Sequence, residues 1–250
     1  MTHWNALVLG GGDPNDPFAT AHQAPVKPLI PIHGKAMAVY VLEALKNSGR
    51  ISHIAYIGPT TPEVSGLIDQ TLPDQGSLIG NLEFGVKNMP AGARVLVVTA
   101  DIPMLTGAEL QSLLDSTPDS GLVYPIVRKE DCEKAYPGVK RTYARLKDGT
   151  FTGGNIFILK PEIVSTFLPK LKAMLANRKN PLKLAGLIGF GTLLKLLTGQ
   201  LGLKGLEQKV GGLLGVTVSA MPTPHASVGT DVDKDGDLEL AKRQLSKNQG

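Results

Sequence analysis

Apolar residues recur along the chain with two different spacings, which predict alternating strands and helices. Short apolar runs, of which RVLVVT at 94–99 is the clearest, are typical of strands buried in a parallel sheet. Segments with apolar residues three or four positions apart, such as 77–88, are typical of helices covered on one face. We predict strands at 6–9, 51–57, 94–99, 122–127 and within 151–159, and helices at 35–47, 64–70, 77–88 and 108–115.

This alternation favours a three-layer α/β/α fold with a mostly parallel sheet. Residues 13–31 are rich in Pro, Asp and Asn and show no period, so we predict a long loop there, of a kind that is usually functional.

Residues 161–215 differ from the rest of the chain because they are rich in Leu, Gly and Lys. They predict two or three helices with no strand between them. No stretch has the ~18 uncharged apolar residues that are needed to cross a bilayer. We expect a single domain over 1–250 with a helical insertion at about 161–215, which packs on the core, forms a homodimer contact or touches a membrane surface.

Composition narrows the function classes. The chain has 250 residues, 42% of them hydrophobic, and a formal net charge of +4, which suits small anionic substrates such as phosphates. The basic residues are too few and too scattered to indicate nucleic-acid binding. Cys132 is the only cysteine, which excludes a disulfide framework. The first twelve residues do not resemble a signal peptide, so we expect a cytoplasmic enzyme.

An acidic cluster near the carboxyl end, GTDVDKDGDLELAK at 229–242, has the spacing of an EF-hand calcium loop that begins at Asp231. Such a loop needs a bidentate carboxylate at its twelfth position, which is Lys242 here. It also needs a helix on both sides, but prolines interrupt residues 216–229. The calcium-loop interpretation therefore fails, and the cluster needs another explanation.

Three other features carry candidate chemistry. The glycines at 10–12 follow the first strand, where main-chain N–H groups can approach a phosphate, although a tight turn is the alternative. They match neither the P-loop pattern nor the dinucleotide-binding pattern. Lys27, fixed by the following proline, can neutralise a triphosphate. Asp101 follows the clearest strand, at the sheet edge where ligands lie, and can bind Mg²⁺.

Four motifs in order resemble one superfamily. They are LVLGGG at 7–12, KPLIPIHGK at 27–35, VTADIP at 98–103 and GTDVDKDGDL at 229–238. Together they are similar to the nucleotidyltransferase superfamily with its GT-A-like, Rossmann-related fold, and within it to the MobA-like NTP transferases. The resemblance covers roughly 1–160 and 216–245, and leaves the helical insertion outside.

The resemblance implies a Mg²⁺-dependent (or Mn²⁺-dependent) nucleotidylyltransferase that transfers NMP from an NTP to a small phosphorylated acceptor and releases pyrophosphate. It implies that Asp101 and Asp231 bind the metal, with Asp233 as a competitor of Asp231; Asp233 or Asp235 would otherwise cap the last helix. The implied catalytic residues are Lys27, Asp101 and Asp231. The implied nucleotide-binding residues are Leu9, Gly10, Gly11, Gly12, Lys27, Thr99 and Ala100. The acceptor-binding candidates are Lys140, Arg141, Arg145, Gly154 and Asn155.

One departure from the family pattern keeps other functions open. The family loop usually reads LAGGxGxRM, whereas no arginine lies between Gly12 and Lys27 here. A GT-A-type glycosyltransferase that uses a nucleotide-sugar is one alternative, although Asp101-Ile102-Pro103 lacks the D-x-D of that class. A non-catalytic nucleotide-binding or membrane-associated protein is the other.

Overall fold

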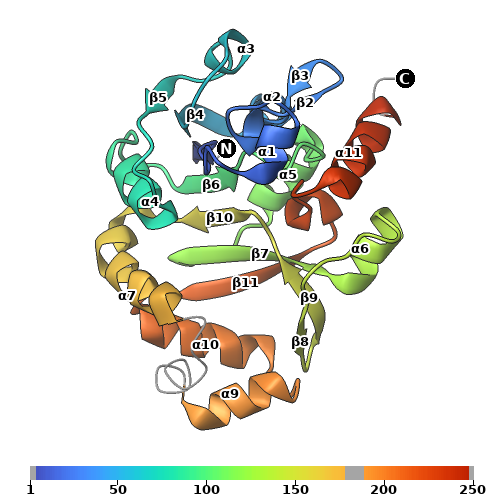
Figure 1. Ribbon diagram of the computed structural model, residues 1–250. Coiled ribbons are helices and arrows are strands. Elements are labelled where there is room, and N and C mark those ends of the chain that lie inside the picture. Colours follow the sequence, from blue (N-terminus) through green and yellow to red (C-terminus); the bar gives the residue numbers. More distant parts are fainter. Residues whose placement is uncertain (1–3, 178–188, 248–250) are drawn as a thin grey trace.

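The computed structural model describes residues 4–177 and 189–247 (Figure 1). The strands are β1 (Trp4–Leu9), β2 (Pro31–Ile32), β3 (Lys35–Ala36), β4 (Ile51–Ile57), β5 (Gln70–Leu72), β6 (Val95–Thr99), β7 (Leu122–Arg128), β8 (Ala144–Leu146), β9 (Gly149–Gly153), β10 (Ile156–Leu159) and β11 (Val218–Thr223). The helices are α1 (Pro17–Ala21), α2 (Met37–Asn47), α3 (Pro62–Ser65), α4 (Leu78–Lys87), α5 (Gly107–Asp115), α6 (Lys129–Ala135), α7 (Val164–Asn177), α9 (Phe190–Leu197), α10 (Leu203–Leu214) and α11 (Asp235–Lys247). Short 3₁₀ helices are η1 (Lys27–Leu29), η2 (Pro161–Ile163) and η3 (Ala226–Gly229).

A mixed, mostly parallel sheet forms the centre of the molecule. Its order is β5-β4-β1-β6-β10-β7-β9-β8, and β11 pairs with β7. Strands β5, β4, β1 and β6 are parallel, whereas β10 runs antiparallel to both β6 and β7. Leu9 at the end of β1 pairs with Thr99 at the end of β6. The loops after these two strands therefore leave the sheet at the same edge, where ligands bind in open α/β sheets.

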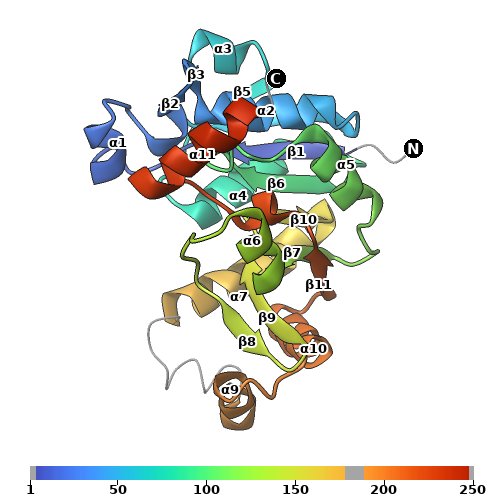
Figure 2. The same ribbon diagram turned by 90° about the vertical axis from the view of Figure 1, so that its right-hand side faces the viewer.

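Helices cover both faces of this sheet (Figures 1 and 2). Successive residues of a strand point to opposite faces. Ala6 and Val8 accordingly pack in one core cluster with residues of α2 and α5, and Leu7 packs in a second with residues of α4, α7 and α10. This arrangement confirms the expected three-layer α/β/α fold.

The structure corrects three details of the expected elements. The helix expected at 64–70 is shorter and earlier: Thr61 caps α3 and Gly66 ends it, and the chain then joins the sheet as β5. The strand expected within 151–159 is two strands, β9 and β10, which both pair antiparallel with β7 but in different registers; β10 also pairs with β6. The loop expected at 13–31 contains α1, which Asp16 caps and Pro17 begins.

The described part of the segment 161–215 is helical. Phe167 of α7 and Leu214 of α10 are buried in the same cluster as Leu7 of β1. Residues 178–188 of this segment lie outside the described residues. Among the helices that the structure describes, none is both long and apolar enough to cross a membrane. The single-domain organisation remains a prediction.

Candidate active site

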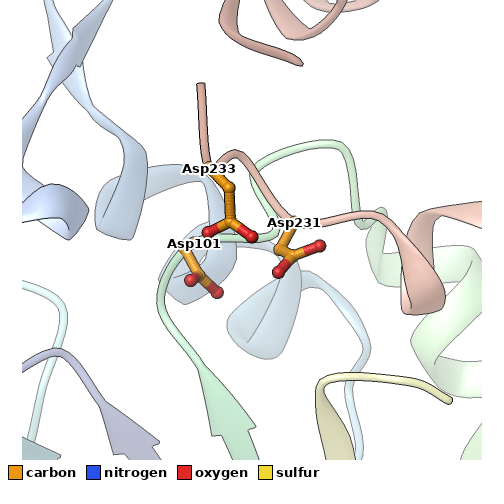
Figure 3. A group of neighbouring side chains, drawn as sticks. All are labelled: Asp101, Asp231 and Asp233. Atoms are coloured by element: carbon orange, nitrogen blue, oxygen red, sulfur yellow. The ribbon is translucent and has the colours of Figure 1, made fainter. Parts of the chain in front are cut away.

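Three aspartates from distant parts of the chain meet at the carboxyl edge of the sheet (Figure 3). Asp101 follows β6, and Asp231 and Asp233 lie between η3 and α11. One carboxylate oxygen from each residue lies within 4.8 Å of the other two. The main chain fixes this meeting, because the N–H of Val232 donates a hydrogen bond of 2.9 Å to the carbonyl oxygen of Asp101.

Two cations form ion pairs with the three aspartates and offset part of their negative charge. The Nζ atom of Lys27 lies 2.7 Å from Oδ2 of Asp101 and also forms an ion pair with Asp233. Arg141 forms an ion pair with the carboxylate of Asp231 and donates a second hydrogen bond of 2.8 Å to its main-chain oxygen. Asp233 therefore faces Lys27 rather than capping the last helix. Helix α11 begins at Asp235, and it is Asp237 that accepts the N–H of Asp233.

The surroundings shift the pKa of several of these groups. Burial alone would lower the pKa of Lys27, but the charges and hydrogen bonds of Asp101 and Asp233 outweigh it and raise the pKa well above its usual range. Burial, followed by the charges of Asp233 and Asp101, raises the pKa of Asp231 to about 6. Burial opposes ionisation of Asp233, yet Lys27 lowers its pKa below the usual value. Lys27 thus keeps its charge at neutral pH.

The aspartates also fit a divalent cation. Oδ1 of Asp101 is buried, and no hydrogen-bond partner for it is found in the described structure. Buried polar atoms nearly always have a partner, so this oxygen is suited to a ligand. Carboxylate oxygens are the ligands that Mg²⁺ and Mn²⁺ prefer. Asp101, Asp231 and Asp233 can therefore hold such an ion. In this geometry Asp231 and Asp233 can both be ligands beside Asp101.

A cavity of about 700 Å³, here called the large cavity, extends from Asp101 to the start of α4. Of the residues expected to bind a nucleotide, it is lined by Leu9, Gly11, Gly12, Lys27 and Thr99.

The two other residues expected to bind the nucleotide, Gly10 and Ala100, do not line the large cavity. Gly10 lies against the ring of Tyr56, which a Cβ would approach to 2.0 Å, and Ala100 is fully buried beneath the loop.

A second cavity of about 290 Å³, here called the Lys140 cavity, adjoins two of the three aspartates. Lys140, Arg141 and Asn155 line it, as do Asp231 and Asp233. The cluster is therefore divided between the two cavities: Asp101 lines the large cavity, and Asp231 and Asp233 line the Lys140 cavity.

Gly154 and Arg145, which were also expected near an acceptor, do not line the Lys140 cavity. The N–H of Gly154 bonds the carbonyl oxygen of Pro125. Arg145 pairs with Thr150 in the β8–β9 hairpin, which carries it beside Gly199.

Sequence reasoning missed the part of the large cavity that is lined by Asp74, Ser77 and Asn81, beside Gly11. Asn81 donates a hydrogen bond of 3.0 Å to Oδ1 of Asp74, which also accepts the N–H of Gly76. Ser77 caps α4. The signal in the sequence is the Asp-x-Gly-Ser turn immediately before the helix, because such turn and cap residues often present polar groups at the end of a sheet.

The chain is similar to known transferases. The MobA-like NTP transferase domain matches residues 6–185, which is most of the chain and extends into the segment that we expected to lie outside the resemblance. A solved structure of a hypothetical transferase from Thermus thermophilus is 42% identical, with a TM-score of 0.87, over 95% of this chain and all of that chain. None of the curated proteins matches.

More distant structures share the fold. The CMP:2-keto-3-deoxy-manno-octonic acid synthetase in complex with CTP is 14% identical, with a TM-score of 0.60, over 99% of this chain and all of that chain. A nucleotidyl transferase from Methanothermobacter is 16% identical, with the same TM-score of 0.60 and the same coverage. With the family match over residues 6–185, the chain belongs to the MobA-like NTP transferase family.

Proposed function

We propose that this protein is a Mg²⁺-dependent nucleotidylyltransferase, which transfers NMP from an NTP to a phosphate-bearing acceptor with release of pyrophosphate. One observation carries the proposal: three aspartates, neutralised by Lys27 and Arg141, lie between two cavities that are lined by polar residues. Two phosphate-bearing substrates can therefore approach the same cluster from two separate cavities.

The NTP occupies the large cavity in this proposal. Its phosphates lie against Lys27 and the main chain of Gly12, and its base lies toward Asp74, Ser77 and Asn81, where Oδ2 of Asp74 faces Gly11. A carboxylate repels phosphate but accepts hydrogen bonds from a base, which supports this orientation over the reverse one. Lys27 is the cation of this cavity wall among the described residues, and so takes over the role of the arginine missing from the loop.

The acceptor occupies the Lys140 cavity. Lys140 and Arg141 attract its phosphate, and Asn155 offers a hydrogen-bonding side chain beside them. Asn155 also fixes the distance between the two cavities, because its carbonyl oxygen accepts the N–H of Thr99 at 3.0 Å. A phosphate in this cavity lies close to Asp231, where Arg141 offsets the repulsion between the two anions.

The chemistry needs positioning and charge neutralisation rather than a covalent intermediate. Asp101, Asp231 and Asp233 would hold the Mg²⁺, which supplies positive charge to the phosphate oxygens when it is bound. An oxygen of the acceptor phosphate attacks the α-phosphorus, and the bond to the β-phosphate oxygen breaks with its electron pair leaving on pyrophosphate. Lys27 stabilises the charge that this step moves onto the leaving group. Phosphate monoesters are already ionised at neutral pH, so no general base is required.

Thermal unfolding with each of ATP, GTP, CTP and UTP, with and without Mg²⁺, tests the proposal. A ligand at a hundred times its Kd stabilises a protein by ~2.7 kcal/mol. We expect a Mg²⁺-dependent rise in Tm with at least one nucleotide, which Asp101→Asn abolishes. Asp115→Asn is the matched control, because Asp115 pairs with Arg50 at the exposed end of α5, away from both cavities. No nucleotide-dependent shift in the unmodified protein would contradict the proposal.

A further inference from the structure

A third cavity, of about 240 Å³ and here called the apolar cavity, lies on the sheet face that is covered by α4, α7 and α10. Its wall consists of aliphatic and aromatic side chains, among them Phe157 from β10, Phe167 from α7 and Val210 from α10. Among the described residues of the wall, Glu207 is the charged one, and its carboxylate accepts the N–H of Ala220 at 2.8 Å. Such a wall offers water too few partners, so the cavity suits hydrocarbon.

The apolar cavity adjoins both phosphate-binding regions. Leu9 and Leu78 line it and also line the large cavity. Tyr124 lines it as well, and a Cβ at Gly153 would lie 1.8 Å from the hydroxyl oxygen of Tyr124, so this ring reaches the wall of the Lys140 cavity. A molecule with its phosphate near Asp101 can therefore extend its apolar part past Leu9 and Leu78 into this cavity, whereas the ring of Tyr124 lies between this cavity and the Lys140 cavity.

The size of the apolar cavity exceeds that of an ordinary packing defect. Protein interiors are close-packed, with few voids larger than a water molecule. An engineered cavity of ~150 Å³ lined by similar side chains binds benzene. By proportion, 240 Å³ accommodates a hydrocarbon group of roughly ten carbons. Binding sites for small molecules commonly combine such an apolar space with a few polar groups at one end.

We propose that the acceptor is the phosphate monoester of an apolar alcohol, and that its hydrocarbon chain occupies the apolar cavity. This inference rests on the proposed function and names its substrate class. The acceptor phosphate oxygen forms the new bond to the α-phosphorus, the α–β phosphoanhydride bond breaks, and pyrophosphate leaves with the electron pair. The product is a nucleoside diphosphate esterified to the apolar alcohol, and no oxidant or reductant is needed.

A chain-length series of n-alkyl phosphates tests the inference, from methyl to dodecyl phosphate and below the concentrations at which they form micelles. Isothermal titration calorimetry measures their Kd in the presence of Mg²⁺. Each added CH₂ that enters the cavity lowers Kd by up to about fourfold. We expect the gain to continue to roughly ten carbons and then stop, because that length fills the cavity. Decanol, which lacks the phosphate, binds at least tenfold more weakly than decyl phosphate. Equal affinity for methyl and decyl phosphate would overturn the inference.

Substitutions in the wall locate the chain. Ala220→Leu adds three carbons to the wall from β11, so we expect the gain in affinity to stop about three carbons earlier in the series. Val210→Phe narrows the cavity from the side of α10. We expect the gain in affinity to stop at a shorter alkyl chain in this variant as well. Ala108→Leu is the matched control, because Ala108 is exposed on α5 and lines none of the three cavities. An unchanged break point in folded Ala220→Leu and Val210→Phe places the chain elsewhere and refutes the assignment.

Pyrophosphate release separates this inference from the proposed function. If kcat/KM for pyrophosphate release is at least tenfold higher with decyl phosphate than with methyl phosphate, both the nucleotidyl transfer and the apolar acceptor are supported. Release with methyl phosphate as efficient as with decyl phosphate retains nucleotidyl transfer and overturns the apolar acceptor. Chain-dependent binding without release of pyrophosphate overturns nucleotidyl transfer to these phosphates. The release of pyrophosphate is then compared between hexadecyl phosphate in phosphatidylcholine vesicles and free decyl phosphate. This comparison distinguishes a membrane-borne acceptor from a soluble one.

Discussion

Gly11 and Gly12 are neighbours in the loop after β1, but they have different surroundings. A Cβ on Gly11 would lie 2.1 Å from Oδ2 of Asp74, whereas a Cβ on Gly12 would lie 3.9 Å from Val26, an ordinary contact. Asp74 cannot move freely, because its other oxygen accepts hydrogen bonds from Gly76 and Asn81. The absence of a side chain is therefore required at Gly11 and not at Gly12.

The first prediction compares alanine at these two positions. We expect Gly11→Ala to displace Asp74, to lower the free energy of unfolding by ~1–3 kcal/mol as an overpacked substitution does, and to weaken NTP binding at least tenfold. Gly12→Ala is the control for the packing argument and should change the free energy of unfolding by less than about 0.5 kcal/mol, because its Cβ meets only Val26 at an ordinary distance. Urea unfolding and nucleotide titration measure the two effects. Equal loss in both variants would contradict the role given to Gly11.

Lys27 occupies the position between Asp101 and Asp233 where a divalent cation is expected to bind. Its ammonium group and the metal therefore compete for the same carboxylates when no nucleotide is present. Coulomb's law gives ~4 kcal/mol for two unit charges 4 Å apart at an effective dielectric constant of 20, so this competition is large enough to measure.

The second prediction concerns Lys27→Met. We expect this variant to bind Mn²⁺ about tenfold more tightly than the unmodified protein in the absence of nucleotide, because the competing charge is gone. We expect its nucleotidyl-transfer rate to fall at least a hundredfold, because the leaving group loses its cation. Lys27→Arg keeps the charge and serves as the control in the Mn²⁺ titration. Weaker Mn²⁺ binding by Lys27→Met would show that Lys27 assists the metal instead of competing with it.

At the scale of elements, the predictability of each part follows from the kind of signal that encodes it. The run at 94–99 forms β6 because a buried strand needs only an apolar sequence. Helix α4 begins after Ser77 as expected, since its cap is local. The separation of β9 from β10 has no local signal, because it depends on the register in which each strand pairs with β7 and on the additional pairing of β10 with β6.

In the candidate site too, residues with a local sequence signal could be singled out, whereas residues whose position depends on packing could not. The sequence singles out Asp101 and Lys27 as candidates because each lies beside a recognisable strand or proline, and the structure brings these two side chains together. Asp74 and Asn81 were missed because their place in the large cavity depends on how α4 packs against the sheet. Arg145 was misplaced because the β8–β9 pairing carries it away from Arg141, four residues earlier in the sequence.

The third prediction follows from the packing of α4 on β1. Gly85 of α4 faces Leu7, whose side chain a Cβ would approach to 2.4 Å. Alanine is favoured over glycine inside a helix by ~1 kcal/mol, but the collision with a buried leucine outweighs this gain, so we expect Gly85→Ala to lower the stability by ~1–3 kcal/mol. In α10, no described atom lies within 4 Å of a Cβ at Gly212. Gly212→Ala should therefore raise the stability by up to ~1 kcal/mol in the same urea experiment, and a loss there would contradict this packing argument.

At the scale of the whole molecule, the helices α7 and α10 of the segment 161–215 share the core of the sheet. Leu214 of α10 and Phe167 of α7 are buried with Leu7, Val95 and Val97. Strand β11, which follows α10, pairs with β7 in the same sheet. These contacts connect the helices to both halves of the sheet. The stability of the helices should therefore depend on the stability of the sheet.

The fourth prediction tests whether the chain unfolds as one unit. Trp4 is the only tryptophan and is buried in β1, so its fluorescence reports the sheet, whereas far-ultraviolet circular dichroism reports mainly the helices. If the helices of 161–215 belong to a single domain, the two signals follow the same urea transition. Leu214→Ala, which removes a buried side chain of α10, should then shift both midpoints together by an amount equivalent to ~2–5 kcal/mol. The helical signal could instead be lost at lower urea, with the midpoint of the Trp4 fluorescence transition unaffected by Leu214→Ala. That result would show that these helices form a separate cooperative unit. The apolar cavity would then lie between two units that unfold independently.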